Sequence, residues 1–520
     1  MILTAYDSRV PACFANRTRW AGRLVTSVLA ATFALLPSAR ADETRPHDDP
    51  KMRPAAPVTL NRKDIGYRGI WYMNQTTGNE FKYKYSGGLG TYCDYHQPLA
   101  VYRPEVERTF FCYGGTAPDS NRKLRHMVSY FDHKTKTVPR PTFLLDKQTD
   151  DAHDNPVLSV DADGYVWVFS ASHGLGRPSY IHRSKRPYDI DEFEQLNPVR
   201  KEGAGEVAID NFSYPQFWHD PQHGFVSFFT RYSYPAARTS CFMTSPDGVR
   251  WSAWQRLAAI GAGHYQTSAI CPGKYGTVMN YHPAGLGLNH RTNLYFLETT
   301  DGGQSWHAVD GAQLTLPLLE VQNDALVHDY ESESLLVYLK DLVYDADRRP
   351  VIVYETSRGH APGPDNSPRT LCTARWNGKK WVRRPISETD HNYDSASLYI
   401  EDNDLWRVIT PTEPGPQAYS TGGEMVIWRS TDQGRNWTKE RQMTEGSERN
   451  HTYARRPINA HPDFYALWAD GNSLQPSESR LYFCNQAGDV FALPVEMSGA
   501  CEAPLRVEGP VRAASATSHR

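Results

Sequence analysis

Residues 299–306, TTDGGQSW, carry the pattern S/T-x-D-x-G-x-x-W, which returns at residues 430–437 as STDQGRNW. A version one residue shorter, SPDGVRW, occupies residues 245–251. In such a stretch the aspartate accepts hydrogen bonds from backbone N–H groups, the glycine takes a positive φ, and the tryptophan packs beneath the turn. Each copy therefore predicts a tight turn between two antiparallel strands.

These stretches resemble Asp-boxes, also called BNR repeats, which are typical of the outer strand pair of a β-propeller blade. Around them, short apolar or aromatic runs alternate with turns rich in Gly, Asp, Asn and Pro, as expected for strands. We therefore predict an all-β fold: a single β-propeller, most simply of seven blades with four antiparallel strands each. Six blades fit the same repeats, and the repeats themselves indicate structure rather than function.

The N-terminal region has the pattern of an export signal. Arginines precede an apolar run over residues 24–36, and small residues follow at the spacing of a cleavage site. The run is too short for a membrane span, so we expect a secreted or periplasmic protein, two fates that the signal does not distinguish. The predicted segments are a signal peptide (1–41), a disordered lead-in (42–57), a β-propeller catalytic domain (58–510) and a flexible tail (511–520).

Composition excludes several classes of protein. A net charge of −3 argues against a general nucleic-acid-binding surface. The eight cysteines, of which seven lie beyond the signal, are scattered and form no CxxC pair, which excludes a disulfide-dense scaffold. The motifs of phosphate-binding loops, serine-hydrolase elbows and HExxH metalloproteases are also missing from the sequence.

Residues 150–183 read as a strand–turn–strand pair with one histidine at each end. His153 precedes the first strand, DADG at 161–164 suits a tight turn, and His173 follows the second strand. Because a hairpin brings its outer ends together, we expect the two imidazoles to line one small site.

This hairpin and four other segments resemble the BNR-type polysaccharide lyases, and among them the seven-bladed ulvan lyases. The resemblance spans most of the chain after the signal and is strongest between Gly66 and Arg231. The segments are GYRGIWY (66–72), KYSGGLGTY (84–92), NFSYPQ (211–216) and TRY (230–232), together with DAHDNP (151–156) and SASHG (170–174).

The resemblance implies cleavage of an anionic, ulvan-like sulfated polysaccharide by β-elimination, which leaves a 4,5-unsaturated uronyl product. This reaction needs a group that neutralises the uronate carboxylate, a base for the C5 proton and an acid for the departing O4. Carried over, His153 and His173 match the paired histidines, Tyr214 the catalytic tyrosine and Arg231 the neutralising arginine. We expect Tyr214 and His153 to form the acid/base pair, with His173 positioning the substrate or sharing proton transfer.

Further residues are predicted around this centre. Arg238 and Tyr234 are the alternatives to Arg231 and Tyr214. The predicted substrate contacts are Tyr265, Tyr281, Arg238 and Arg358. A nitrogen and sulfur ligand set for a structural metal is offered by His264, Cys271, His282 and His290. Zinc or calcium would be structural there, since the elimination requires no cofactor, and the favoured alternative is that these four residues are unrelated loop positions.

Each of these assignments has a structural alternative. The histidines could stabilise turns, Tyr214 could be a buried corner residue, and Arg231 could be an ordinary ion-pair partner. The competing functions are a glycoside hydrolase of rhamnosidase or sialidase type on the same propeller, and a non-catalytic carbohydrate-binding propeller. We expect a monomer with a polysaccharide as its partner, no nucleic acid and no membrane span.

Overall fold

The computed structural model describes residues 59–509 except 233–235. The predicted signal peptide, lead-in and tail, and Tyr234, lie outside the described residues. Strands dominate the described part, whose helices are three short 3-10 turns: η3 (Ala152–Asp154), η4 (Pro364–Asn366) and η5 (Asp402–Asp404). None of these helices has the length and apolar character to cross a membrane. The all-β prediction is therefore confirmed.

In most sheets, strands that follow one another along the chain lie side by side and pair antiparallel. The first sheet contains β1 (Thr59–Lys63), β4 (Ala100–Arg103), β5 (Arg108–Gly115), β6 (Arg125–Asp132) and β8 (Thr142–Asp146). The second contains β9 (Pro156–Val160), β10 (Val166–Ser170), β11 (Tyr180–Ser184) and β12 (Phe193–Leu196). The third contains β15 (Ser213–Asp220), β16 (Gly224–Tyr232), β17 (Arg238–Ser245) and β19 (Gln255–Ala258).

The same arrangement continues through the second half of the chain. The fourth sheet contains β20 (Gln266–Cys271), β21 (Lys274–Tyr281), β22 (Thr292–Thr299) and β23 (Leu326–His328). The fifth contains β24 (Leu336–Tyr344), β25 (Pro350–Ser357), β26 (Arg369–Trp376) and β27 (Trp381–Thr389). The last contains β28 (Ser397–Ile400), β29 (Trp406–Pro414), β30 (Gly423–Ser430), β31 (Thr438–Gln442), β32 (Asn450–Arg455), β33 (Ala466–Gly471), β34 (Leu481–Cys484), β35 (Val490–Ala492) and β37 (Leu505–Arg506).

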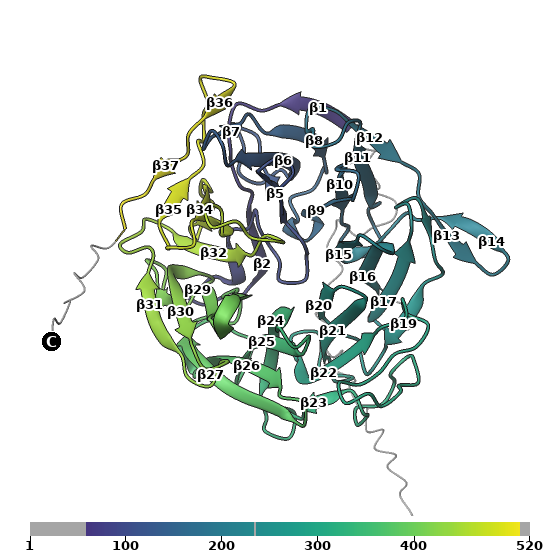
Figure 1. The fold of residues 1–520 in the computed structure, drawn as a ribbon. Helices are drawn as coiled ribbons and strands as arrows, with labels where there is room; N and C mark the ends of the chain where they lie inside the picture. Colours follow the sequence, from purple (N-terminus) through teal and green to yellow (C-terminus); the bar gives the residue numbers. More distant parts are fainter. Residues whose placement is uncertain (1–58, 233–235, 510–520) are drawn as a thin grey trace, which may run out of the picture. The chain divides into compact units, whose positions relative to one another are not determined.

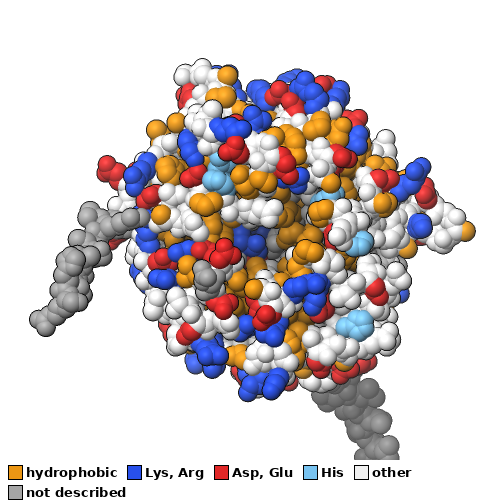
Figure 2. All heavy atoms as spheres, in the orientation of Figure 1, with side chains coloured by type: hydrophobic (Ala, Val, Ile, Leu, Met, Phe, Trp, Pro, Cys, Tyr) orange, Lys and Arg blue, Asp and Glu red, His pale blue; other side chains and the backbone are white. Residues whose placement is uncertain are grey.

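Three smaller sheets complete the described fold. They are the pair β2 (Trp71–Thr76) and β3 (Tyr83–Gly88), the pair β7 (Val138–Pro139) and β36 (Cys501–Glu502), and the group β13 (Val199–Glu202), β14 (Gly205–Ala208) and β18 (Arg250–Trp251). The large sheets follow one another in chain order around a common centre, as in a propeller, and the last sheet lies beside the first (Figure 1). Figure 2 shows that this face is hollowed at the centre, with Lys and Arg side chains inside the hollow.

The Asp-box turns adopt the predicted local structure. In residues 430–437, Asp432 Oδ1 accepts the backbone N–H groups of Arg435 (3.1 Å) and Asn436 (2.9 Å), and Gly434 has a φ of 76°. In residues 299–306, Trp306 is 2 % exposed and packs edge-on against Phe242. All three turns directly follow the third strand of a four-strand group (β17, β22 and β30), and the turn at 430–437 leads straight into the outer strand β31.

The hairpin that carries the two histidines has the predicted register. β9 and β10 pair from Val160 opposite Val166 to Pro156 opposite Ser170. Asp161 accepts two backbone N–H groups of the turn, whose last residue, Gly164, has a φ of 86°. The turn η3, which contains His153, directly precedes β9, and His173 follows β10, so both histidines lie at the same end of the hairpin.

Candidate active site

Two stacked imidazoles share one carboxylate at the end of this hairpin. The rings of His153 and His173 lie 3.9 Å apart with 15° between their planes. Asp151 Oδ1 accepts from His153 Nδ1 at 2.6 Å, and Asp151 Oδ2 accepts from His173 Nδ1 at 2.9 Å. The predicted proximity of the two histidines is confirmed, and Asp151 is the residue that holds them together.

The protonation of Asp151 fixes the tautomer of both rings. Burial alone would raise the pKa of this carboxyl, but His153 and His173 outweigh that effect and hold the pKa well below its usual range. An ionised carboxylate only accepts hydrogen bonds, so both Nδ1 atoms carry protons. The Nε2 atom of each ring therefore points away from Asp151 and is the nitrogen that can carry a lone pair.

A buried ion pair stabilises the end of the hairpin that carries the two histidines. Asp154 Oδ1 accepts the backbone N–H of His173 at 2.6 Å, and Arg177 Nε donates to Asp154 Oδ2 at 2.7 Å. Lys147 Nζ lies 3.8 Å from the same carboxylate. These contacts fix the backbone at His173 and hence the direction of its ring.

The two Nε2 atoms differ in their surroundings. His153 Nε2 lies 2.9 Å from the hydroxyl of Tyr85 and 2.8 Å from that of Tyr92, and the ring is 3 % exposed. His173 Nε2 has no hydrogen-bond partner among the described residues, and the His173 side chain is 17 % exposed. The second ring is therefore the one whose lone pair is available to a ligand.

Tyr214 lies beside both imidazoles. Its ring centre is 6.0 Å from that of His153 and 6.2 Å from that of His173. A φ of 49° and a register shift between β15 and β16 turn this residue out of the regular strand alternation. Burial, and then the neighbouring Tyr232 and Tyr265, raise the pKa of the Tyr214 hydroxyl well above its usual value, so it is protonated at neutral pH.

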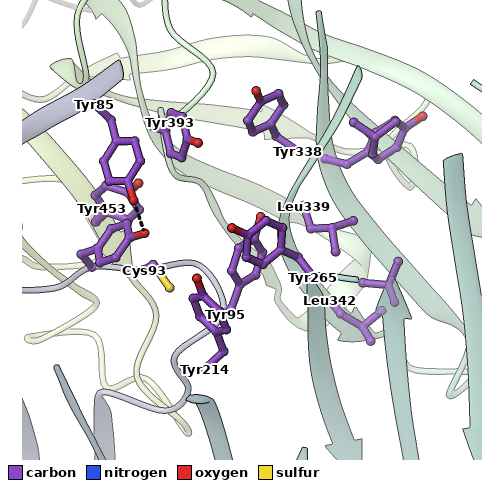
Figure 3. Packing of buried hydrophobic residues seen from close by; sticks show 14 of the residues in the cluster. Tyr85, Cys93, Tyr95, Tyr214, Tyr265, Tyr338, Leu339, Leu342, Tyr393 and Tyr453 are labelled. Atoms are coloured by element: carbon purple, nitrogen blue, oxygen red, sulfur yellow. Dashed lines mark hydrogen bonds between the residues drawn. The ribbon is translucent and has the colours of Figure 1, made fainter. Parts of the chain in front are cut away.

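Tyrosines from distant segments surround the same region. Figure 3 shows Tyr95, Tyr214 and Tyr265 side by side, with Tyr85, Tyr393 and Tyr453 nearby. The Tyr95 and Tyr265 rings stack at 4.6 Å, and Tyr265 meets Tyr214 edge-on at 5.3 Å. Such a surface offers flat apolar faces and hydroxyl groups together, which suits a sugar ring.

Two buried arginines lie among these tyrosines. Arg238 is 4 % exposed, lies 4.8 Å over the Tyr265 ring and donates from Nε to the Tyr232 hydroxyl at 3.3 Å. Arg291 is 1 % exposed, lies 4.5 Å over the Tyr265 ring and donates to the Tyr393 hydroxyl at 3.1 Å. No carboxylate lies within 4.0 Å of Arg291 among the described residues. The site therefore contains buried positive charge suited to an anionic ligand.

Arg231 occupies a different environment. Its Nη1 donates to the Asn211 carbonyl at 2.6 Å, and its guanidinium lies 4.2 Å over the Trp254 ring. Asn211 in turn donates to the carbonyl of Gly174, next to His173. Arg231 is thus linked to the histidine loop through Asn211, whereas Arg238 contacts the tyrosines around Tyr214 directly.

The predicted sugar contacts separate into two groups. Tyr265 lies in the centre of the tyrosine cluster, and Arg358 is exposed after β25. Tyr281 belongs to another hydrophobic cluster, where its hydroxyl bonds to Glu331 and its ring meets Tyr295 at 6.1 Å. The structure thus places Tyr281, on β21, away from the tyrosines around Tyr214, and its role as a sugar contact stays a prediction.

The predicted metal ligands do not gather. His264 uses Nδ1 on the Asn280 carbonyl and Nε2 on the Ile260 N–H, and His282 Nδ1 bonds the His290 carbonyl. Among the described residues, only two groups bring three His, Cys, Asp or Glu ligand atoms within 4.8 Å, and neither includes these residues or Cys271. Backbone hydrogen bonds thus explain these histidines, and the seven described cysteines are all free.

The chain was compared with known families and structures. The model of a family described as "BNR repeat-containing family member" matches residues 118–389, more than half of the 520-residue chain. The chain belongs to this family. The match covers the histidine hairpin, Tyr214, and both Arg231 and Arg238.

The chain is also similar to two proteins named as ulvan lyases. One, "Ulvan Lyase-PL25" of Pseudoalteromonas sp. (strain PLSV), is 24% identical over 389 residues, covering 67% of this chain and 74% of that protein. The other, "Ulvan lyase" of Alteromonas sp. (strain LOR), is 23% identical over 447 residues, covering 76% and 84%. A solved polysaccharide lyase PL25 ulvan lyase shares the fold, with a TM-score of 0.61 at 17% identity over 82% of this chain and 96% of that one.

Several site residues of this BNR repeat protein were missed in the sequence. Asp151 stands two positions before His153 in DAHDN, and this D-x-H spacing at a turn was the available signal. Tyr85 and Tyr92 lie in a segment already noted for its resemblance, but nothing local indicates that they reach His153. No sequence pattern marks Arg291 as a site residue, because its partners lie far from it in the sequence: Tyr338 on β24 and Tyr393 between β27 and β28.

Proposed function

We propose that this protein is a lyase that cleaves an ulvan-like, uronic-acid-containing polysaccharide by β-elimination. The observation that carries the proposal is the pair of Asp151-bound imidazoles facing Tyr214 beside a buried arginine. The relatives at 23–24% identity are named ulvan lyases. One structure with this fold is described as bound to -[GlcA(1-4)Rha3S]-, a glucuronate-containing sugar.

The site residues supply each requirement of the elimination. A base takes the C5 proton, the electron pair forms the C4–C5 double bond, and O4 departs with a proton from an acid. Tyr214 is the proposed acid, because its raised pKa keeps the hydroxyl protonated at neutral pH. Arg238 neutralises the charge that develops on the uronate carboxylate. These steps use side chains of this chain alone.

His173 is the proposed base. Its Nδ1–H is held by Asp151, which leaves the Nε2 lone pair to accept the C5 proton. His153, expected from the sequence to form the acid/base pair with Tyr214, has its Nε2 bonded to two tyrosine hydroxyls, and its ring stacks on that of His173. We therefore assign His153 to positioning, together with stabilisation of the imidazolium that forms on His173.

The product identifies the reaction. Incubation with ulvan should release oligosaccharides whose 4,5-unsaturated uronyl ends absorb in the ultraviolet, with one new reducing end for each unsaturated end. Reducing ends without that absorbance would instead indicate a glycoside hydrolase. Binding of ulvan without either signal would indicate a carbohydrate-binding propeller.

Substitution of the two candidate arginines should reduce activity by different amounts. Arg238→Gln should lower kcat/KM by about 100-fold, because it removes positive charge where the carboxylate develops charge. Arg238→Lys should recover part of that loss, and Arg231→Gln, whose side chain bonds Asn211 next to the histidine loop, should have a smaller effect. Rates measured on one ulvan preparation show which substitution lowers activity more. A larger loss for Arg231→Gln would mean that Arg231 is the neutralising residue.

We also propose a propeller of seven blades and an exported, monomeric enzyme. The large sheets resolve into seven groups of four or five strands if the last sheet is divided before β32, where a single pair, Gly423 of β30 and His451 of β32, joins the two parts. The apolar run over 24–36 supports export. N-terminal sequencing of protein from the culture medium tests export. The mass of that protein in solution tests the monomeric state.

A further inference from the structure

A second histidine pair lies where the first and last sheets meet. His133 follows β6, and His461 and Asp463 lie between β32 and β33. The two imidazole centres are 4.0 Å apart, and Asp463 Oδ2 lies 3.8 Å from His133 Nδ1 and 3.6 Å from His461 Nδ1. Three candidate ligand atoms from the two ends of the fold thus fall within 4.8 Å of one another.

His133 has a nitrogen with no partner. Its Nε2 is hydrogen-bonded to Thr109 Oγ1 at 2.8 Å, while its buried Nδ1 has no hydrogen-bond partner among the described residues. The ring is 5 % exposed, and burial, reinforced by His461, lowers its pKa to about 4. Burial also lowers the pKa of His461. The unpartnered Nδ1 of His133 is thus a nitrogen positioned to bind a metal.

We propose that His133, His461 and Asp463 bind a divalent transition-metal ion of the zinc class. Two imidazole nitrogens and one carboxylate oxygen are ligands that zinc favours, with a water in the fourth position. Ligand atoms about 2.0 Å from a tetrahedral zinc ion lie about 3.3 Å from one another. The observed separations of 3.6 and 3.8 Å exceed this by only a few tenths of an ångström. His133 Nδ1 has no partner among the described residues, whereas His461 Nδ1 accepts the backbone N–H of Asp463 at 3.1 Å, a hydrogen bond that a metal bound to this nitrogen would replace.

The ammonium group of a lysine contacts the same carboxylate. Lys136 Nζ bonds to Asp463 Oδ2, and its side chain is 55 % exposed. The ammonium supplies the positive charge that the metal would supply, so binding requires Lys136 to release this oxygen and return to solvent. Lys136 is therefore a competitor of the metal, which gives the proposal a distinctive test.

The position of the site gives the metal a structural role. Tyr102, on the edge strand β4, packs against both imidazoles at 5.1 and 4.8 Å, and its N–H donates to the Ile458 carbonyl at 2.9 Å. Other backbone contacts join the two ends of the described fold nearby, such as the Ile458 N–H to the Ala100 carbonyl at 2.9 Å and the β7–β36 pair. A metal here would cross-link the two ends of the described fold and raise its unfolding temperature, because it binds the folded state alone.

The test uses full-length protein without a histidine tag and two matched variants. Asp463→Asn and Lys136→Gln both break the same ion pair, but only the first removes a ligand. Titration of metal-free protein with Zn²⁺, followed by calorimetry and by unfolding temperature, should show one site in the wild type. Asp463→Asn should weaken it by about 10- to 100-fold or more, as should His461→Gln. Lys136→Gln should bind more tightly than the wild type.

The outcomes separate this site from the catalytic one. Zn²⁺ bound to the Asp151 histidine pair would be unaffected by Asp463→Asn, so unchanged binding in that variant would overturn the proposal. Weaker binding in Lys136→Gln would overturn it too, because it would show that the lysine assists rather than competes. Co²⁺ gives an independent readout, since a tetrahedral site with nitrogen ligands should produce visible absorption that Asp463→Asn abolishes. Ulvan cleavage should be the same in wild type and Asp463→Asn.

Discussion

Tyr214→Phe is expected to lower kcat on ulvan by about 100- to 10,000-fold, the range that general acid catalysis contributes. The substitution removes one oxygen and keeps the aromatic ring that packs against Tyr95 and Tyr265. Without the hydroxyl, O4 must leave as an unprotonated alkoxide. Since the ring contacts persist, KM should change far less than kcat, and initial rates of ultraviolet absorbance measure both.

Two matched tyrosine variants control for this result. Tyr232→Phe removes a hydroxyl that donates to the Tyr214 hydroxyl at 3.3 Å, so a loss smaller than that of Tyr214→Phe is expected. Tyr281→Phe removes a hydroxyl in a separate hydrophobic cluster and should leave kcat unchanged. If Tyr214→Phe retained wild-type kcat, the acid would have to be another group, and the proposed assignment would be wrong.

Asp151→Asn should lower kcat by as much as about 10,000-fold, as loss of an aspartate that fixes a histidine tautomer does in serine proteases. Asp151 Oδ1 accepts both the backbone N–H and the Nδ1–H of His153, so the amide oxygen should remain there. The amide NH₂ group then faces His173 Nδ1, which must become an acceptor. The proton of His173 moves to Nε2, and the proposed base loses its lone pair.

Asp150→Asn is the matched control for this change. Asp150 is the adjacent residue, and its carboxylate is ion-paired with Arg122 Nη2 at 2.7 Å, with 31 % of the side chain exposed. Its substitution should leave activity near the wild-type level. A second measurement, the unfolding temperature, shows whether Asp151→Asn is folded. A folded Asp151→Asn protein with full activity would show that the His173 tautomer does not matter.

The local part of the site could be predicted from the sequence. Alternating apolar residues and a DADG turn placed His153 and His173 at one end of a hairpin, and the structure pairs them at 3.9 Å. Tyr214 was found through its resemblance to known lyases, and it does lie beside them. The resemblance selected Arg231 with Arg238 as its alternative, and the sequence could not test that order, because both arginines flank the same β16–β17 hairpin.

The sequence by itself determined the strands, the Asp-box turns and the histidine hairpin, because each depends on residues within about one turn or one strand pair. Only the tertiary structure decided what surrounds the imidazoles, such as the hydroxyls of Tyr85 and Tyr92 on His153. It alone placed His133 beside His461, which lie more than 300 positions apart. Such contacts depend on how whole sheets pack around a common centre, and no local pattern of side chains records that packing.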